Sequence, residues 1–112
     1  MIKADFVRNR TGYLESVTLT GHAGSGEYGF DIVCAAVSTL SINLVNSLEV
    51  LADCAVDLDI NEKDGGFMRI DISHMTHNTE EKVQLLFESF LLGMTNLEEN
   101  SSEFVSTTVI TN

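Results

Sequence analysis

The N-terminal part of the chain alternates between apolar and polar side chains. From Ile2 to Phe6 every second side chain is apolar, and charged side chains stand between them. Residues 9–12, Asn-Arg-Thr-Gly, are turn-forming types, and residues 13–20 alternate again. Alternation with a period of two is typical of half-buried strands, so this part predicts a β-hairpin.

Residues 31–53 change to helical spacing. Apolar side chains recur three and four positions apart, which predicts one long helix with Asp31 as its N-cap. Further apolar residues lie on its other faces, so we expect burial on more than one side. The repeating positions are Val33, Val37, Leu40, Leu44, Leu48 and Leu51.

The second half of the chain predicts three more strands and one more helix. Residues 56–60 and 68–72 alternate around a glycine-containing turn, and residues 104–110 are rich in β-branched side chains. Between them, Asn78 and Glu81 have the spacing of a capping box. The helix after it is predicted to bury Val83, Leu86, Phe87, Phe90, Leu91 and Met94.

The predicted order ββαββαβ defines an α+β fold. Hairpins imply antiparallel pairing, and two amphipathic helices require a sheet to cover. We expect two helices packed on a mostly antiparallel sheet. Because single domains commonly contain ~100–150 residues, residues 1–112 are expected to form one domain.

The charge of the chain restricts its partners. With 17 acidic and 6 basic residues, the net charge is −11, which disfavours direct binding to nucleic acid or to anionic membranes. A basic protein or peptide would be attracted, although solubility alone also explains such a surface. The N-terminus lacks the apolar region of a secretory signal, and we expect that the chain contains no run of ~20 apolar residues that could span a bilayer. These features predict a cytoplasmic location.

Residues 24–29, Gly-Ser-Gly-Glu-Tyr-Gly, match the dinucleotide fingerprint G-x-G-x-x-G. That fingerprint requires a βαβ unit with a parallel partner strand and an acidic residue at the end of that strand. Glu49 has the right separation but lies within the predicted helix, and Glu27 would place a carboxylate beside the phosphates. We interpret the match as accidental and expect no cofactor.

A metal centre is the second hypothesis. His74 and His77 have a zinc-like local spacing, but structural zinc sites usually combine two close pairs of ligands. Cys34 and Cys54 are 20 positions apart in one apolar segment, and if that segment is helical they are too far apart for a second pair of ligands or for a disulfide. We therefore expect no metal site, and two free thiols. The remaining residue that could bind a metal ion is His22.

A cysteine nucleophile is the third hypothesis. Cys34 would occupy about the third position of the predicted helix, where unpaired N–H groups favour a thiolate and could form an oxyanion hole. His22, at the end of the preceding strand, could accept the thiol proton. A buried cysteine is more often a small apolar side chain, which is our interpretation of Cys54. Asp31 would cap the helix and oppose the thiolate, and Ser38 lies one turn beyond Cys34.

The same residues resemble a known family, the ribosomal-processing cysteine proteases of Firmicutes and related bacteria. The resemblance rests on residues 21–24, Gly-His-Ala-Gly, on Tyr28-Gly29, and on residues 31–38, Asp-Ile-Val-Cys-Ala-Ala-Val-Ser. It implies a catalytic dyad of Cys34 and His22, with Asp31 and Ser38 as supporting residues. It also implies a homodimer and a loop that orders over the substrate. The loop residues are Gly21, Ala23, Gly24, Ser25, Gly26, Glu27, Tyr28, Gly29 and Phe30.

The resemblance implies a specific reaction. Members of the family remove a short N-terminal extension from the precursor of a basic large-subunit ribosomal protein, the twenty-seventh, and cleave after two phenylalanines. An aromatic extension requires an apolar pocket near the thiol, which Tyr28 and Phe30 could line. The alternative is a non-enzymatic ribosome-assembly module that binds basic peptides through its acidic surface.

Overall fold

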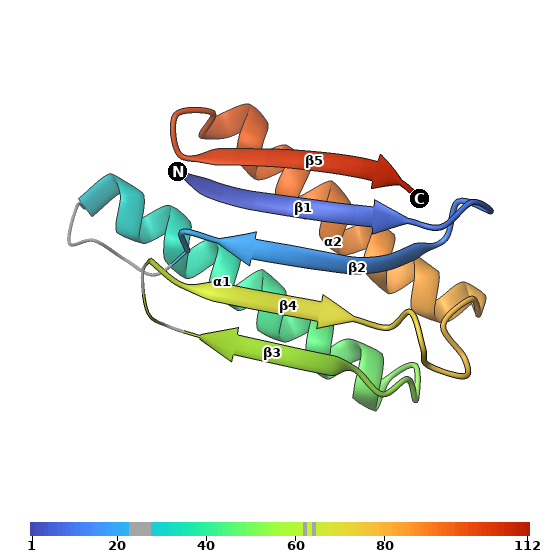
Figure 1. Cartoon of the computed structure of the whole chain (residues 1–112). Coiled ribbons are helices and arrows are strands. Elements are labelled where there is room, and N and C mark those ends of the chain that lie inside the picture. Colours follow the sequence, from blue (N-terminus) through green and yellow to red (C-terminus); the bar gives the residue numbers. More distant parts are fainter. Residues whose placement is uncertain (23–27, 62, 64) are drawn as a thin grey trace.

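The computed structural model describes residues 1–22, 28–61, 63 and 65–112. Across these residues the elements follow the predicted order and form an α+β fold (Figure 1). The elements are β1 (Ile2–Arg8), β2 (Leu14–Thr20), α1 (Tyr28–Val50), β3 (Asp57–Asn61), β4 (Phe67–Asp71), α2 (Glu81–Asn100) and β5 (Val105–Thr111).

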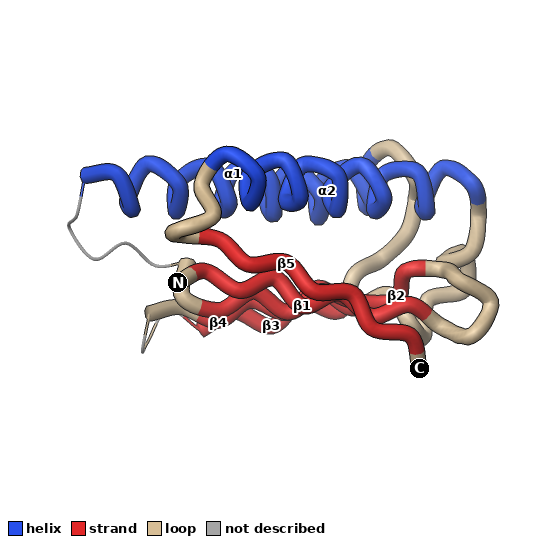
Figure 2. The backbone as a smooth tube through the Cα atoms, turned by 90° about the horizontal axis from the view of Figure 1, so that it is seen from above, coloured by secondary structure: helices blue, strands red, loops and turns tan. Residues whose placement is uncertain are grey.

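The strands form one sheet in the order β3-β4-β2-β1-β5. The pairs β1–β2, β2–β4 and β3–β4 are antiparallel, and β5 runs parallel to β1. The predicted mostly antiparallel sheet is therefore confirmed, with one parallel pair at an edge. Figure 2 shows that both helices lie on the same face of the sheet.

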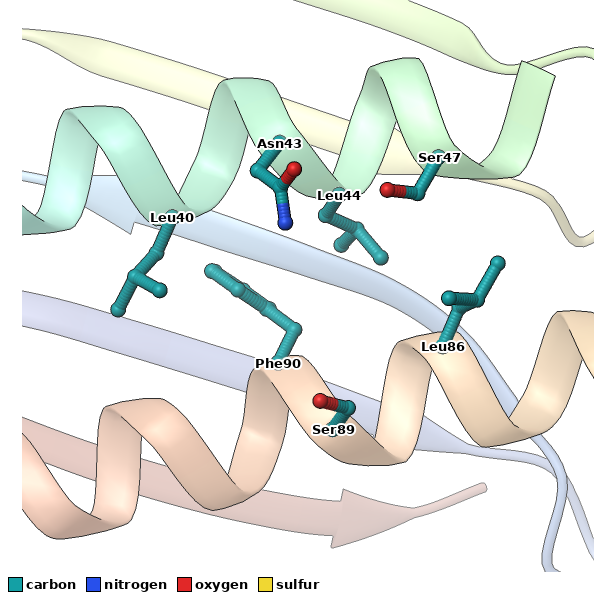
Figure 3. Close-up of a pocket in the computed structure, with 7 residues that line it drawn as sticks. All are labelled: Leu40, Asn43, Leu44, Ser47, Leu86, Ser89 and Phe90. Carbon is teal, nitrogen blue, oxygen red and sulfur yellow. The ribbon is translucent and has the colours of Figure 1, made fainter. Parts of the chain in front are cut away.

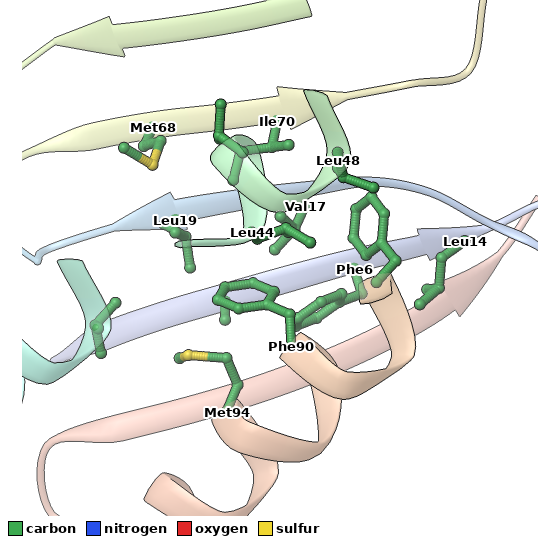
Figure 4. Close-up of a cluster of buried hydrophobic side chains, with 14 of the residues drawn as sticks. Phe6, Leu14, Val17, Leu19, Leu44, Leu48, Met68, Ile70, Phe90 and Met94 are labelled. Carbon is green, nitrogen blue, oxygen red and sulfur yellow. The ribbon is translucent and has the colours of Figure 1, made fainter. Parts of the chain in front are cut away.

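The core lies between the helix layer and the sheet. Phe6 of β1 meets Phe90 of α2 with ring centroids 5.6 Å apart, and it meets Phe87 at 6.4 Å. Figure 4 shows side chains from both helices converging on the sheet. Because both helices and most strands contribute to one apolar cluster, we propose that residues 1–112 fold as one domain. Other buried members include Leu14, Val17, Leu19, Leu44, Leu48, Met68, Ile70 and Met94.

Helix α1 differs from the prediction in its start. It begins at Tyr28 rather than near Asp31, so Asp31 lies inside the first turn and is not the N-cap. The aromatic residues before Asp31 extend the helix because Phe30 packs on Phe104 with ring centroids 5.8 Å apart. This contact is tertiary, and local capping preferences do not reveal it.

The predicted capping box of α2 is wrong. The N-cap is Glu80, which makes no side-chain capping hydrogen bond. The Nδ2 group of Asn78 instead donates to the carbonyl of Ser73 at 3.2 Å, and the Asn78 carbonyl accepts from Gln84 at 2.8 Å. Asn78 therefore organises the connection before the helix. Of the apolar residues predicted on this helix, Val83, Phe87, Phe90 and Met94 are buried, and Leu86 and Leu91 are partly buried.

Strand β3 is less buried than its alternation predicts. It lies at an edge of the sheet, and all of its residues are exposed, including Leu58 and Ile60. Pairing with Ile70 and Met68 places these two side chains on the helix-facing side. They lie at an edge that the helices do not fully cover.

Helix α1 is long and apolar enough to cross a membrane, by length and composition only. The sequence-based expectation that no segment meets this criterion is therefore wrong. In the fold, α1 packs beside α2 over the sheet (Figure 2) and contributes Val37, Leu44 and Leu48 to the core. Its buried residues form one stripe, and Ile32, Ile42 and Val50 are exposed, so the expected burial on more than one side is wrong.

Candidate active site

His22 is held immediately after the end of β2. Gly21 precedes it with φ +78°, and a side chain at this position would collide with the carbonyl oxygen of Met1. The Gly21 N–H also donates to the carbonyl of Gly66 at 3.1 Å. The His22 side chain is only 5% exposed. Among the described residues, its buried Nδ1 has no hydrogen-bond partner. His22 is thus an imidazole fixed by its backbone, with a ring nitrogen that no described side chain uses.

Cys34 lies on the buried side of α1 and is 4% exposed. Burial raises the pKa of its thiol above the ordinary value, and the nearby Asp31 carboxylate raises it further. The expectation that the helix start depresses this pKa is therefore wrong for this structure. Because α1 begins at Tyr28, Cys34 lies beyond the first turn, where N–H groups normally have intrahelical acceptors.

The fold brings the two groups to the same end of the molecule. In Figure 1, β2 ends on the side of the molecule where α1 begins, and Figure 2 shows that α1 lies in the layer over the sheet. His22 follows β2, and Cys34 faces the core from α1. The structure therefore offers a buried thiol and a buried imidazole on the same side of the molecule, the first from α1 and the second from the residue that follows β2 and Gly21.

The two residues that the sequence predicts as supporting residues lie along the same helix. Asp31 is one turn before Cys34, and Ser38 is half-buried one turn after it. The Tyr28 side chain is 85% exposed at the start of α1, and Gly29 is also exposed. The remaining loop residues of the prediction, Ala23, Gly24, Ser25, Gly26 and Glu27, lie outside the described residues.

Phe104 is a residue at this end that sequence reasoning did not single out. It precedes β5, and its ring stacks on Phe30 with an interplanar angle of 21°. The sequence pattern placed Phe104 at the start of the last strand, as one apolar residue among several. No local signal links it to Phe30, because the contact depends on how α1 crosses the sheet.

A separate groove lies between the middle parts of the two helices (Figure 3). Its lining contains no cysteine, histidine or carboxylate, so it offers no nucleophile or base. The groove is therefore distinct from the thiol–imidazole end of the molecule. The lining residues are Leu40, Asn43, Leu44, Ser47, Leu86, Ser89 and Phe90.

Comparison with known proteins agrees with a thiol enzyme. The family model for the cysteine protease Prp matches residues 1–106. The chain belongs to the Prp family. Ribosomal processing cysteine protease Prp of Bacillus subtilis strain 168 is 34% identical over 101 residues, covering 89% of each chain. As a member of this family, the chain is a cysteine protease, and the alternative of a non-enzymatic module is set aside.

Solved structures show the same fold. The crystal structure of SMU.848 from Streptococcus mutans matches with a TM-score of 0.97 and 69% identity, covering 100% of this chain and 96% of the other. Prp of Staphylococcus aureus, in complex with a substrate peptide, matches with a TM-score of 0.86 and 28% identity, covering 98% and 100%. The two layers of this chain are therefore those of the Prp fold.

The other predicted candidates do not assemble into sites in this Prp chain. His74 and His77 are exposed, and Nδ1 of His77 pairs with Glu80 at 2.8 Å. The described residues include no cluster of three or more metal-ligating side chains. Cys34 and Cys54 are both free thiols, as predicted.

The dinucleotide interpretation also lacks its structural context. In the described sheet, β2 pairs antiparallel with both of its neighbours, β1 and β4. The parallel neighbour that the fingerprint requires is therefore not beside β2. Glu49 lies within α1, not at the end of a strand.

Replacing Asp31 by asparagine is expected to lower the pKa of Cys34. Asp31 raises this pKa, so removing its charge makes the thiolate easier to form, while burial still opposes it. Alkylation of Cys34 by iodoacetamide should reach half its maximal rate at a lower pH in Asp31→Asn. The measurement is the pH profile of alkylation at each cysteine, resolved by peptide mass mapping.

Asp53→Asn is the matched control for this prediction. Asp53 raises the pKa of Cys54 rather than that of Cys34, so this change should leave the Cys34 profile in place. Its backbone already has φ +51°, a conformation that asparagine tolerates. An unchanged Cys34 profile in Asp31→Asn would show that the carboxylate does not act on the thiol.

Proposed function

We propose that this cysteine protease removes the N-terminal extension from the precursor of large-subunit ribosomal protein twenty-seven. The curated relatives are ribosomal processing proteases. Prp of Staphylococcus aureus has been crystallised with a substrate peptide and with a covalently linked product peptide. The net charge of −11 suits a basic ribosomal partner, since opposite charges speed encounter. Within the activity of a ribosomal processing protease, we propose this precursor as the substrate and cleavage after two phenylalanines.

The proposed mechanism uses Cys34 as nucleophile and His22 as general base. The imidazole takes the thiol proton as sulfur attacks the scissile carbonyl. The C–N bond then breaks, the imidazolium protonates the leaving amine, and water hydrolyses the thioester. One observation supports this proposal. The buried imidazole, whose Nδ1 has no partner among the described residues, follows the end of β2 on the side of the molecule where the helix of the buried thiol begins.

Burial of the thiol has a consequence for this mechanism. Because the pKa of Cys34 is raised, its protonated form predominates near neutral pH in the absence of substrate. The imidazole of His22 therefore takes the thiol proton while the sulfur attacks the substrate, and not before the substrate binds. We propose supporting roles for Asp31 and Ser38, and an oxyanion hole made by N–H groups of the first turn of α1 rather than by Cys34 itself.

We further propose that the protein acts in the cytoplasm as a homodimer, without contacting nucleic acid or membranes. Exposed apolar side chains support self-association, because monomers expose contiguous apolar patches only sparingly. They occur on α1 and on the neighbouring edge strand β3, as Ile32, Ile42, Leu58 and Ile60.

Cleavage of synthetic peptides tests the proposed specificity. A peptide containing the Phe-Phe pair should be cut after the second phenylalanine, and replacing that residue by alanine should lower kcat/KM at least about 10-fold by removing apolar burial. The measurement is product identification by mass spectrometry, followed by initial rates. Equal rates on both peptides, or cleavage at another bond, would contradict the assigned specificity.

A further inference from the structure

The start of α1 is attached to the sheet by an aromatic pair. Phe30, in the first turn, stacks on Phe104 with ring centroids 5.8 Å apart and an interplanar angle of 21°. The α-carbon of Gly29 also faces this ring, since a side-chain carbon there would lie 3.7 Å from it. The outer side of the turn faces solvent, with Tyr28 and Ile32 exposed. Among the described residues, Phe104 thus provides the aromatic ring that packs on the first turn of α1, before Cys34.

The backbone of Phe104 is itself fixed at both ends. Its N–H donates to the carbonyl of Ser101 at 2.8 Å, and its carbonyl accepts from the Ile2 N–H at 2.7 Å. Ile2 is fully buried at the start of β1. Figure 2 shows the connection between α2 and β5 rising from the sheet to the helix layer beside α1. The backbone that carries this ring is therefore held by hydrogen bonds on both sides.

The same end of β1 also holds the segment that carries the imidazole. Lys3 pairs with Thr20 at the end of β2, and Gly21 packs directly against the carbonyl of Met1. The first residues of β1 thus contact both the residue before His22 and the residue that supports the start of α1. These residues therefore help to set the position of the His22 imidazole relative to α1, which carries Cys34.

We infer that Phe104 is a positioning residue of this protease, which holds the first turn of α1 so that the thiol of Cys34 stays in register with the imidazole of His22. Phe104 touches neither group in this role. It acts through Phe30 and the helix backbone. A displacement of reacting groups by about 1 Å can cost about 100-fold in rate, so a loosened turn should reduce catalysis strongly. The inference rests on the proposed dyad.

Truncation of Phe104 tests the inference. Phe104→Ala should lower kcat about 10- to 100-fold on the Phe-Phe peptide while KM changes less than about threefold. It should also move the alkylation profile of Cys34 to lower pH, because a loosened turn exposes the thiol whose burial raises its pKa. Phe104→Tyr keeps the stacking ring and should retain kcat within about threefold.

Leu86→Ala is the matched control. Leu86 is a partly buried apolar residue of α2 that lines the groove between the helices, away from the first turn (Figure 3). Urea unfolding should show a loss of stability in this variant, with kcat and the Cys34 profile unchanged. A purely structural role for Phe104 would make Phe104→Ala behave as Leu86→Ala does, and that result would overturn the inference.

A double-mutant cycle adds an independent test. If Phe104 acts through Phe30, then Phe30→Ala combined with Phe104→Ala should lose no more activity than the worse single variant. If the losses of activity in the two single variants multiply in the double variant, Phe104 does not act through Phe30.

Failure of the proposed dyad is distinguishable from failure of the positioning role, because Cys34→Ala would then remain active. If Cys34→Ala is inactive and Phe104→Ala has normal kcat, only the positioning role fails.

Discussion

Cys34→Ala is expected to lose all detectable cleavage of the Phe-Phe peptide, a fall of at least about 10⁴-fold in kcat. The proposed thioester forms on the sulfur of Cys34, and alanine offers no nucleophile. The neighbouring residues of α1 are retained, so the substrate pocket should survive. The measurement is peptide turnover under substrate saturation, with the product quantified by mass spectrometry.

Cys54→Ala is the natural control for this loss. Both cysteines are free and buried, and the pKa of each thiol is raised by burial. Each truncation should cost about 1–2 kcal/mol of unfolding free energy, because each removes one buried sulfur. Only the change at Cys34 should abolish turnover. Activity in Cys34→Ala, or its loss in Cys54→Ala with the fold intact, would place the chemistry elsewhere.

His22→Ala is expected to reduce kcat about 10²- to 10⁴-fold, the usual contribution of a positioned general base. Its residual activity should have a distinct pH dependence. Without the imidazole, only the fraction of Cys34 that is already ionised can attack the substrate. The rate should therefore rise about tenfold per pH unit until the pH reaches the raised pKa of Cys34. Initial rates between about pH 6 and 10 measure this slope.

His77→Ala controls for the loss of a histidine as such. His77 is exposed and pairs with Glu80 on the connection before α2, far along the chain from the thiol. Its replacement should leave both kcat and the pH profile unchanged. If His22→Ala kept the wild-type profile, His22 would not be the base, whatever its effect on stability.

Local sequence signals were sufficient for the architecture because the strands at the centre of the sheet bury one face. The alternation from Ile2 to Phe6 and at Val17 and Leu19 corresponds directly to buried positions. The same rule overestimated the burial of β3, since Leu58 and Ile60 alternate correctly but lie at an edge. A pattern specifies which face a side chain is on, and the fold determines whether anything covers that face.

Helix ends were harder to predict because other contacts outweigh capping preferences. Asp31 is a favourable N-cap type, yet the ring of Phe30 packs on Phe104 and the helix continues back to Tyr28. Asn78 has the right spacing for a capping box, but its side chain bonds to Ser73. Phe104 is distant from Phe30 in the sequence, whereas Ser73 is five positions before Asn78 and therefore precedes the residues of the predicted capping box.

The sequence alone suggests the two residues of the proposed dyad, but not their surroundings. Cys34 and His22 stand out because a helix bearing a thiol follows a strand that ends in an imidazole, and this depends only on nearby residues. The raised pKa of Cys34 could not be predicted, because it follows from burial under a neighbouring layer. Phe104 could not be identified either, since its contact with Phe30 joins distant parts of the chain.

The central claim is that cleavage passes through a thioester on Cys34, with His22 as the base. Rapid acid quenching of the protease with the Phe-Phe peptide, followed by peptide mapping, tests it most directly. The account predicts that the N-terminal fragment of the substrate is attached to Cys34, and that its formation slows at least about 100-fold in His22→Ala. Attachment at another residue, or equally fast acylation in His22→Ala, would contradict it.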